Sequence, residues 1–376
     1  MTTFDLILIG FGNVARRFVR LVEELEPALR AEHGVSTRLV GVATRSRGCA
    51  FDARGLDARD LLARFERGAR LGADRASTRS FLKSALGRCG GSARQRRLIV
   101  VELTTLNIAS GQPAIDHVRM ALRGGAHVVT ANKGPAAFAY RELAAEEKKA
   151  NRSFRFESSV IDGVPLFNLK RSCLPGVTVS GFQGVLNSTT NYILTAMERG
   201  ERFDAALAAM QRAGIAEADP SLDVDGWDAA AKTAILANVL LNGELTPQTV
   251  EREGVSAAVA ERIAAAGRVG KRVKLVAAAE RAEAVVRGRV RIVEVPETEL
   301  LAQLEGQQNA VILQTDVLGE IAVVQRGSGL TQTAYGLVCD IVGIARQLRE
   351  TSRPASTTRL RRAARRDRSP SPRVRR

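Results

Sequence analysis

Short apolar runs alternate with helix-like segments over the first 150 residues. Residues 4–9 (FDLILI) form an apolar stretch that stops at Gly10, and residues 16–29 then repeat apolar positions at helical spacing. Unbroken apolar runs are typical of parallel strands buried on both faces. Strands that alternate with helices predict an α/β fold with a doubly wound parallel sheet. Further strands are expected at 38–43, 97–103 and 126–130, a helix at 113–123, and a loop with short helices at 44–95.

The pattern changes after about residue 150. Residues 286–325 alternate apolar and polar positions, which is typical of antiparallel strands with one exposed face. Long alanine-rich segments at helical spacing precede them, so we expect an α+β arrangement in this half. Its strands are predicted at 154–160, 177–186 and within 286–325, and its helices near 191–199, 203–213, 226–242, 256–266 and 332–348.

Much of the positive charge lies at the end of the chain. Residues 351–376 contain ten arginines and one acid, so they carry +9 of the net charge of +16. This tail has almost no large apolar residue and cannot bury enough surface to offset its ordering entropy, which predicts disorder. We interpret it as a solvated appendage, and weak, non-specific binding of nucleic acid is the alternative.

Several features bear on where the protein resides. No apolar run reaches the roughly 18 residues that a membrane-spanning helix needs. The first residues lack a basic region followed by an apolar stretch, so no secretory signal is expected. The four cysteines form no CxxC pair, which argues against a disulfide framework or a zinc ribbon. We therefore expect a cytoplasmic protein without membrane association.

A glycine-rich turn joins the first strand to the first helix. In its GxGxxA pattern, Gly10 permits a tight turn, Gly12 lets a pyrophosphate approach the backbone, and Ala15 allows close helix packing. Glycine turns join strands to helices in many proteins, but at this place in an α/β pattern the motif favours a Rossmann-like dinucleotide site. Contacts are expected from Gly10, Phe11, Gly12, Asn13, Val14 and Ala15.

The end of the second strand bears on the choice of dinucleotide. Residues 43–47 (ATRSR) contain no acid, and none follows before Asp52. An acid at this place binds the ribose hydroxyls of NAD, whereas a cation accommodates the 2′-phosphate of NADP. We therefore expect NADP to be preferred over NAD, with Arg45 as the contact. The alternative is that these arginines are merely solvated loop residues.

Two stretches carry side chains suited to acid–base chemistry. Lys133 follows the strand at 126–130, and ligands bind at the carboxyl ends of strands in open α/β sheets. Residues 216–232 (AEADPSLDVDGWDAAAK) place five acids within twelve positions ahead of Lys232. Asp228 and Lys232 are spaced i, i+4 and share one face of a predicted helix, a spacing that a surface ion pair would also explain.

A third stretch, residues 184–194 (GVLNSTTNYIL), places small polar side chains ahead of a helix. This layout suits binding of a carboxylate, but helix capping by Ser188 or Thr189 also explains it. The chain has no GxSxG elbow, and its three histidines lie outside these clusters, which argues against a Ser/His/Asp hydrolase. His127, inside a predicted strand, is interpreted as a core residue.

Together, GFGNVA, HVVTANKGP, GVLNSTTNYIL and AEADPSLDVDGWDAAAK resemble the motifs of the homoserine dehydrogenase family over about residues 5–345, and the last two are specific to it. The resemblance implies a homodimeric NAD(P)-dependent enzyme that interconverts L-aspartate 4-semialdehyde and L-homoserine in threonine, methionine and isoleucine biosynthesis. It also implies a nucleotide-binding domain at 1–150, a substrate-binding and dimerisation domain at 151–325, a C-terminal helix returning to the nucleotide domain at 326–350, and a tail at 351–376.

The resemblance assigns roles to individual residues as well. Lys232 is similar to the family's proton donor, and Lys133 to a second lysine near cofactor and substrate. Hydride delivery to an aldehyde makes an alkoxide, so an ammonium at that oxygen stabilises the charge and supplies the proton. Substrate contacts are implied at Glu217, Asp223, Asp228 and Thr190, with Glu217 and Asp228 holding the amino group, and cofactor contacts at Lys133, Thr104, Thr105 and Gly329.

The stretch FESSVIDGVPLF resembles the family's sodium site, in which a glutamate and main-chain carbonyls bind Na⁺. The matching positions are Glu157, Val160, Asp162 and Val164. Asp162 stands where small residues are common, a change that a carbonyl ligand tolerates.

Two features depart from the family pattern. We expect neither the fused aspartate kinase nor the C-terminal regulatory domain that many members carry, and hence no feedback inhibition through them. The Arg-rich tail is foreign to the family. Two alternatives therefore stay open: a dehydrogenase of another small amino-bearing semialdehyde or hydroxy acid, and a degenerate dehydrogenase fold with a nucleic-acid-binding tail.

Overall fold

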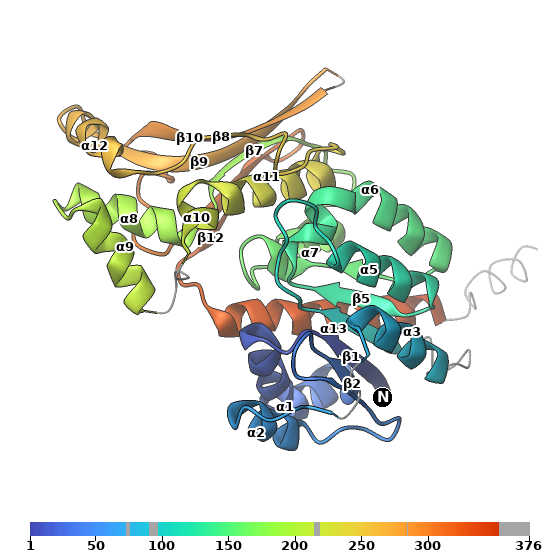
Figure 1. Cartoon of the computed structure of the whole chain (residues 1–376). Helices are drawn as coiled ribbons and strands as arrows, with labels where there is room; N and C mark the ends of the chain where they lie inside the picture. The colour runs from blue at the N-terminus through green and yellow to red at the C-terminus, as the bar shows by residue number, and fades with distance from the viewer. Residues whose placement is uncertain (73–75, 90–96, 214–218, 284, 353–376) are drawn as a thin grey trace, which may run out of the picture.

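The chain folds around two six-stranded sheets (Figure 1). The computed structural model describes residues 1–72, 76–89, 97–213, 219–283 and 285–352, so Glu217 and the predicted disorder of the Arg-rich tail lie outside the described residues. The first sheet is parallel except for the pairing of β3 with β2, and its order β3-β2-β1-β4-β5-β6 confirms the doubly wound arrangement. Its strands are β1 Thr2–Ile9, β2 Val35–Ala43, β3 Cys49–Phe51, β4 Leu98–Glu102, β5 His127–Thr130 and β6 Phe154–Arg155.

Both faces of this sheet are covered, which explains why its strands read as unbroken apolar runs. In β1, Phe4, Leu6 and Leu8 pack into the same cluster as residues of α1 and α13. Ile7 and Ile9 point the other way, into a cluster that includes residues of α3 and α5. The helices are α1 Asn13–His33, α2 Ala58–Glu66, α3 Thr78–Arg88, α5 Ala114–Arg123 and α13 Leu330–Ser352.

The second sheet has the order β12-β11-β7-β9-β10-β8 and is antiparallel apart from the pairing of β10 with β8. Buried and exposed residues alternate along most of β10, so one face packs against helices while the other is exposed. The strands are β7 Val179–Val185, β8 Glu251–Arg252, β9 Lys271–Ala282, β10 Val285–Pro296, β11 Asn309–Thr315 and β12 Gly319–Gln325. The helices are α8 Ser188–Glu198, α9 Phe203–Arg212, α10 Ser221–Val224, α11 Trp227–Leu240 and α12 Ala260–Gly267, with the short η2 Ala257–Val259 before α12.

The two halves meet where α11 packs against α6 (Lys133–Ala150) (Figure 1). The side-chain amide of Asn238 in α11 donates to the carbonyl of Ala137 in α6 (3.4 Å). After β6 the chain forms the short η1 (Glu157–Ser159) and α7 (Leu166–Cys173) before it enters the second sheet. Within the described ranges, no helix is long and apolar enough to cross a membrane.

Several segments differ from the sequence prediction, and two of them have a clear physical reason. The strand expected at 154–160 ends after Arg155, because the N–H of Glu157 donates to Oδ2 of Asp340 in α13 (2.9 Å) instead of to a neighbouring strand. Strand β9 was not predicted, since its alanine-rich sequence favours a helix. It pairs with β10 along its whole length, so tertiary pairing overrides the intrinsic propensity.

Candidate active site

The glycine turn lies between β1 and α1, at the carboxyl ends of the parallel strands. Gly10 has φ +98°, and a Cβ there would lie 2.5 Å from the carbonyl oxygen of Leu103, so a side chain is excluded. A Cβ on Gly12 would meet none of the described atoms within 4 Å, so this backbone faces open space. No side chain of the described residues caps α1, which leaves its first N–H groups to a ligand. An open backbone at an uncapped helix start suits a pyrophosphate.

Positive charge gathers beside this turn, at the end of β2. The hydroxyl of Thr44 accepts from the N–H of Arg47 (2.9 Å) and closes a turn. The Arg47 guanidinium donates to the carbonyl of Phe65 (2.8 Å) and lies over its ring, on which the Arg16 guanidinium also lies. Arg45 is exposed within this turn. Arg47 is therefore held by the protein, whereas Arg45 faces solvent.

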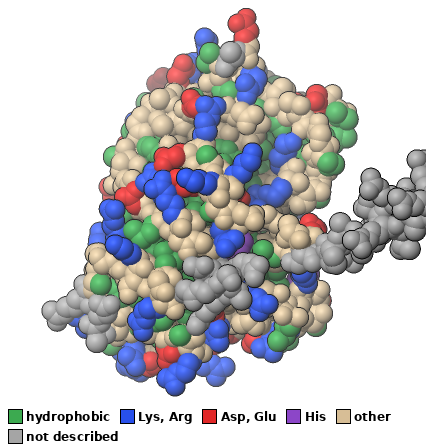
Figure 2. All heavy atoms as spheres, turned by 90° about the vertical axis from the view of Figure 1, so that its right-hand side faces the viewer, with side chains coloured by type: hydrophobic (Ala, Val, Ile, Leu, Met, Phe, Trp, Pro, Cys, Tyr) green, Lys and Arg blue, Asp and Glu red, His purple; other side chains and the backbone are tan. Residues whose placement is uncertain are grey.

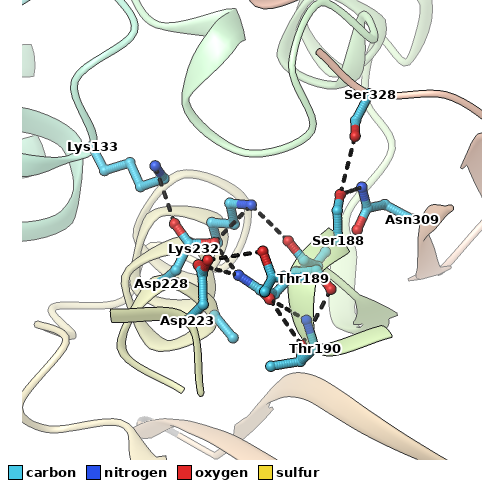
Figure 3. A network of polar contacts seen from close by, with 12 residues as sticks. Lys133, Ser188, Thr189, Thr190, Asp223, Asp228, Lys232, Asn309 and Ser328 are labelled. Carbon is cyan, nitrogen blue, oxygen red and sulfur yellow. Dashed lines mark hydrogen bonds and ion pairs between the residues drawn. The ribbon is translucent and has the colours of Figure 1, made fainter. Parts of the chain in front are cut away.

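Two lysines from different halves of the chain meet at one carboxylate (Figure 3). Lys133 is the first residue of α6, shortly after the end of β5, and Lys232 lies within α11. The Nζ of Lys133 lies 3.1 Å from Oδ1 of Asp228, and the Nζ of Lys232 lies 2.9 Å from Oδ2. The Lys232 ammonium also donates to the carbonyl of Leu186 (2.6 Å). The structure thus brings together residues from two separate sequence motifs.

The charges of this cluster influence one another. Burial disfavours the ionised form of Asp228, but the nearby Lys133 and Lys232 outweigh burial and hold the pKa of Asp228 below its ordinary value. Asp228 in turn raises the pKa of Lys133, against the opposing effect of burial. Burial, followed by repulsion from Asp228, raises the pKa of Asp223. The cluster therefore favours a charged Lys133 and one firmly ionised acid.

The start of α8 supplies polar contacts to both acids. Asn187 caps the helix by accepting from the N–H of Thr190 (2.8 Å), and its amide donates to Asp223 (2.7 Å) and Asp228 (3.0 Å). The hydroxyl of Thr189 donates to Asp223 (2.8 Å). The hydroxyl of Thr190 points back to Oδ1 of Asn187 (2.9 Å) instead.

Sequence reasoning therefore missed two side chains of this site. The polar stretch before α8 does begin a helix, but the alternative interpretation as a cap by Ser188 or Thr189 names the wrong residue, because Asn187 caps α8. What the sequence did not show is which polar side chains turn toward the acids: Asn187 and Thr189 do, whereas Thr190 contributes to the cap.

Comparisons with known proteins address the identity of this site. Residues 165–342 match the family described as homoserine dehydrogenase, and residues 10–157 match its NAD binding domain. The NAD(+)-dependent homoserine dehydrogenase of Pseudomonas canavaninivorans is 37% identical over 347 residues, which cover 92% of this chain and 97% of that protein. The chain belongs to the homoserine dehydrogenase family.

Two further matches extend over nearly the whole length of each partner. The homoserine dehydrogenase of Methanocaldococcus jannaschii is 32% identical over 354 residues, covering 90% of this chain and 98% of that protein. The crystal structure of homoserine dehydrogenase from Thermoplasma acidophilum matches with a TM-score of 0.76 at 25% identity, covering 92% of this chain and all of that one. The chain is thus an NAD(P)-dependent oxidoreductase of the homoserine dehydrogenase type, and neither alternative from the sequence is favoured.

The remaining homoserine dehydrogenase motifs lie around this centre. The N–H of Gly329, in the loop before α13, donates to Oδ2 of Asp162 (3.4 Å). The hydroxyl of Thr333 in α13 donates to Oδ1 of the same carboxylate (2.8 Å), so Asp162 contacts both this loop and the helix that follows it. Thr104 follows β4 and donates its hydroxyl to Glu102, and Thr105 beside it is exposed. The carboxylate of Asp162 is therefore directed at the loop that contains Gly329.

Glu157 is buried, with 1% of its surface exposed. Its two oxygens accept the N–H groups of Phe167 (2.7 Å) and Asn168 (2.8 Å) at the start of α7. Burial, with added repulsion from Asp340, raises the pKa of Glu157 to about 7. In the part of the chain that the structure describes, no group of three or more His, Cys, Asp or Glu could hold a metal. An ion at this place would therefore depend on one carboxylate and main-chain carbonyls.

Proposed function

We propose that the chain catalyses the reversible NAD(P)H-dependent reduction of L-aspartate 4-semialdehyde to L-homoserine, in the cytoplasmic biosynthesis of threonine, methionine and isoleucine. The observation that carries the proposal is the meeting of Lys133 and Lys232 at Asp228. The residues fit a dinucleotide, because Gly12 leaves the backbone open at the start of α1. When bound, the dinucleotide supplies the hydride, and Gly10–Ala15, Thr104, Thr105 and Gly329 would hold it.

The two lysines and the acids have separate roles in the proposed reaction. Lys232 donates a proton to the substrate oxygen, and Leu186 and Asp228 fix the direction of its ammonium. Lys133, whose pKa is raised by Asp228, stays charged and stabilises negative charge at the same oxygen. Asp228, together with Glu217, holds the substrate's amino group. Asp223 is a further acid of the pocket, oriented by Asn187 and Thr189, and Thr190 stays a prediction as a substrate contact.

The cofactor preference is tested by following absorbance of NADPH and NADH separately, with aspartate semialdehyde as substrate. We propose that NADPH is preferred, supported by the exposed Arg45 and by the absence of an acid between residues 43 and 47. The Arg45→Ala variant should lose about tenfold in kcat/KM with NADPH, the scale of one hydrogen bond to a charged group, and change little with NADH.

Ser46→Ala, at the neighbouring exposed position, is the matched control and should preserve the ratio of kcat/KM with NADPH to kcat/KM with NADH. The relative from Pseudomonas canavaninivorans is named as NAD(+)-dependent. If the wild-type form of this chain favours NADH, the proposed NADP preference is contradicted and the proposed activity is not. No turnover with either dinucleotide would contradict the proposed function.

We further propose that Na⁺ binds at Glu157 and the main-chain carbonyls of Val160, Asp162 and Val164. The buried Glu157 carboxylate beside Asp340 supports this proposal, since a cation would offset two neighbouring acids. The melting temperature should be higher in NaCl than in choline chloride of equal ionic strength, because an ion that binds only the folded state stabilises it. Glu157→Gln should remove the difference, and a difference that survives this substitution would place the sodium effect elsewhere.

Finally, we propose a homodimer. The second sheet exposes the apolar side chains of Val285, Val293 and Val324, with exposed arginines between the two valines of β10. Exposed apolar surface on a sheet favours association with a second copy of the chain. Light scattering that gave the mass of a single chain would contradict this proposal.

A further inference from the structure

A buried carboxylate–imidazole pair lies near the edge of the first sheet at which the parallel strands end and the glycine turn begins. Glu102 is the last residue of β4 and His117 belongs to α5, and their exposed fractions are 0% and 1%. The Nδ1 of His117 lies 3.3 Å from Oε1 of Glu102, and its Nε2 lies 3.1 Å from the hydroxyl of Thr78. When Nδ1–H donates to Glu102, Nε2 is left to accept from Thr78, so one neutral tautomer satisfies both partners. No step of the proposed reaction uses this pair.

The carboxylate of Glu102 gathers donors from two strand ends. Its Oε1 accepts from the N–H of Thr104 (3.3 Å) and from the Thr104 hydroxyl, immediately after β4. Its Oε2 lies 3.4 Å from the hydroxyl of Thr130, the last residue of β5, and that hydroxyl also donates to the Glu102 carbonyl (2.7 Å). Glu102 therefore links the carboxyl ends of β4 and β5, at the same edge of the sheet as the glycine turn.

The network continues to the first residue of α6. The N–H of Asn132 donates to the hydroxyl of Thr130 (2.9 Å), and its amide donates to the Thr104 carbonyl (2.9 Å). The Asn132 oxygen accepts from the N–H of Gly134 (2.9 Å) and so caps α6. Lys133 stands between these two residues, so its backbone is fixed on both sides by the network that starts at His117.

We propose that Glu102 and His117 are positioning residues, which hold Thr104 and the backbone of Lys133 in a fixed relation to each other. The inference rests on the proposed function, which assigns Thr104 to the dinucleotide and Lys133 to the substrate oxygen. Buried hydrogen-bond networks fix geometry when every member is satisfied, and the removal of one member leaves a buried group unpaired. Small displacements of a catalytic group lower turnover strongly.

The test compares His117→Leu, His117→Asn and His127→Leu. Leucine removes the donor to Glu102, whereas asparagine keeps an N–H near the position of Nδ1. His127 is a buried histidine at the start of β5, bonded through Nδ1 to the N–H of Ser153 (3.0 Å), and serves as the matched control. We expect His117→Leu to lower kcat per dinucleotide-binding site by ten- to a hundredfold and to weaken dinucleotide binding several-fold in a fluorescence titration. His117→Asn should recover much of both losses, and His127→Leu should show neither.

Two results would overturn the inference: kcat and dinucleotide affinity within twofold of wild type in His117→Leu, or equal losses in His117→Leu and His127→Leu, which would indicate a general effect on the fold. If the wild-type enzyme does not turn over aspartate semialdehyde, the proposed function fails by itself. Dinucleotide affinity then decides on the pair, since Thr104 is positioned whether or not the substrate is correct.

Discussion

Replacement of Lys232 by alanine is expected to lower kcat by about 10²- to 10⁴-fold, the usual contribution of a general acid. The Lys232 ammonium is directed by the Leu186 carbonyl and by Asp228, on the side of the carboxylate opposite Lys133. Alanine removes the proposed proton donor, while the glycine turn that would hold the dinucleotide lies in the other half of the chain. Steady-state kinetics combined with a fluorescence titration of NADPH separates these two effects.

Lys170→Ala is the matched control for this substitution. Lys170 also donates to a main-chain carbonyl, that of Val177 (2.5 Å), but it lies in α7, outside the proposed site. It should retain wild-type kcat. Equal losses of turnover and of dinucleotide affinity in Lys232→Ala would refute the assigned role of Lys232.

Asp228→Asn should lower kcat/KM at neutral pH by ten- to a hundredfold, since it removes a charged partner from both lysines. It should also change the pH profile. Asp228 raises the pKa of Lys133, so its removal lowers that pKa, and Lys133 loses its proton at a lower pH than in the wild type. If the charged form of Lys133 is required, the alkaline limb of the kcat/KM profile moves to lower pH.

Asp225→Asn, at an exposed position in the same segment, should leave both the rate and the profile unchanged. An alkaline limb that stays in place in Asp228→Asn would show that Lys133 does not need its charge for the reaction. The acid would then serve the substrate's amino group alone.

The sequence predicted the elements whose burial pattern is simple. The strands of the first sheet are buried on both faces and read as apolar runs, and the lysine after the run at 126–130 does follow the carboxyl end of β5. Strand β9 was missed because alanines carry little preference for a pleated surface, and its pairing with β10 and β7 decides its conformation. The helix α6, which begins at that lysine, was not anticipated either.

The candidate site was predictable by motif but not by side-chain direction. Asp228 and Lys232 share a helix face, so their contact follows from spacing. The contacts of Asn187 and Thr189 with Asp223 join residues more than 30 positions apart, and only the packing of α8 beside α10 creates them. The pair of Glu102 and His117 was likewise hidden, since a glutamate that ends a strand and a histidine on a helix give no local sign of each other.

The lysine–aspartate–lysine arrangement has a consequence for how the enzyme can open. Lys133 belongs to the first half of the chain, while Asp228 and Lys232 belong to the second, and the contact of α6 with α11 sets their separation. A hinge rotation of one half against the other would pull Lys133 away from Asp228. The three charges can therefore act together only while α6 and α11 keep their contact, and any motion that separated these helices would stop a reaction that needs both lysines.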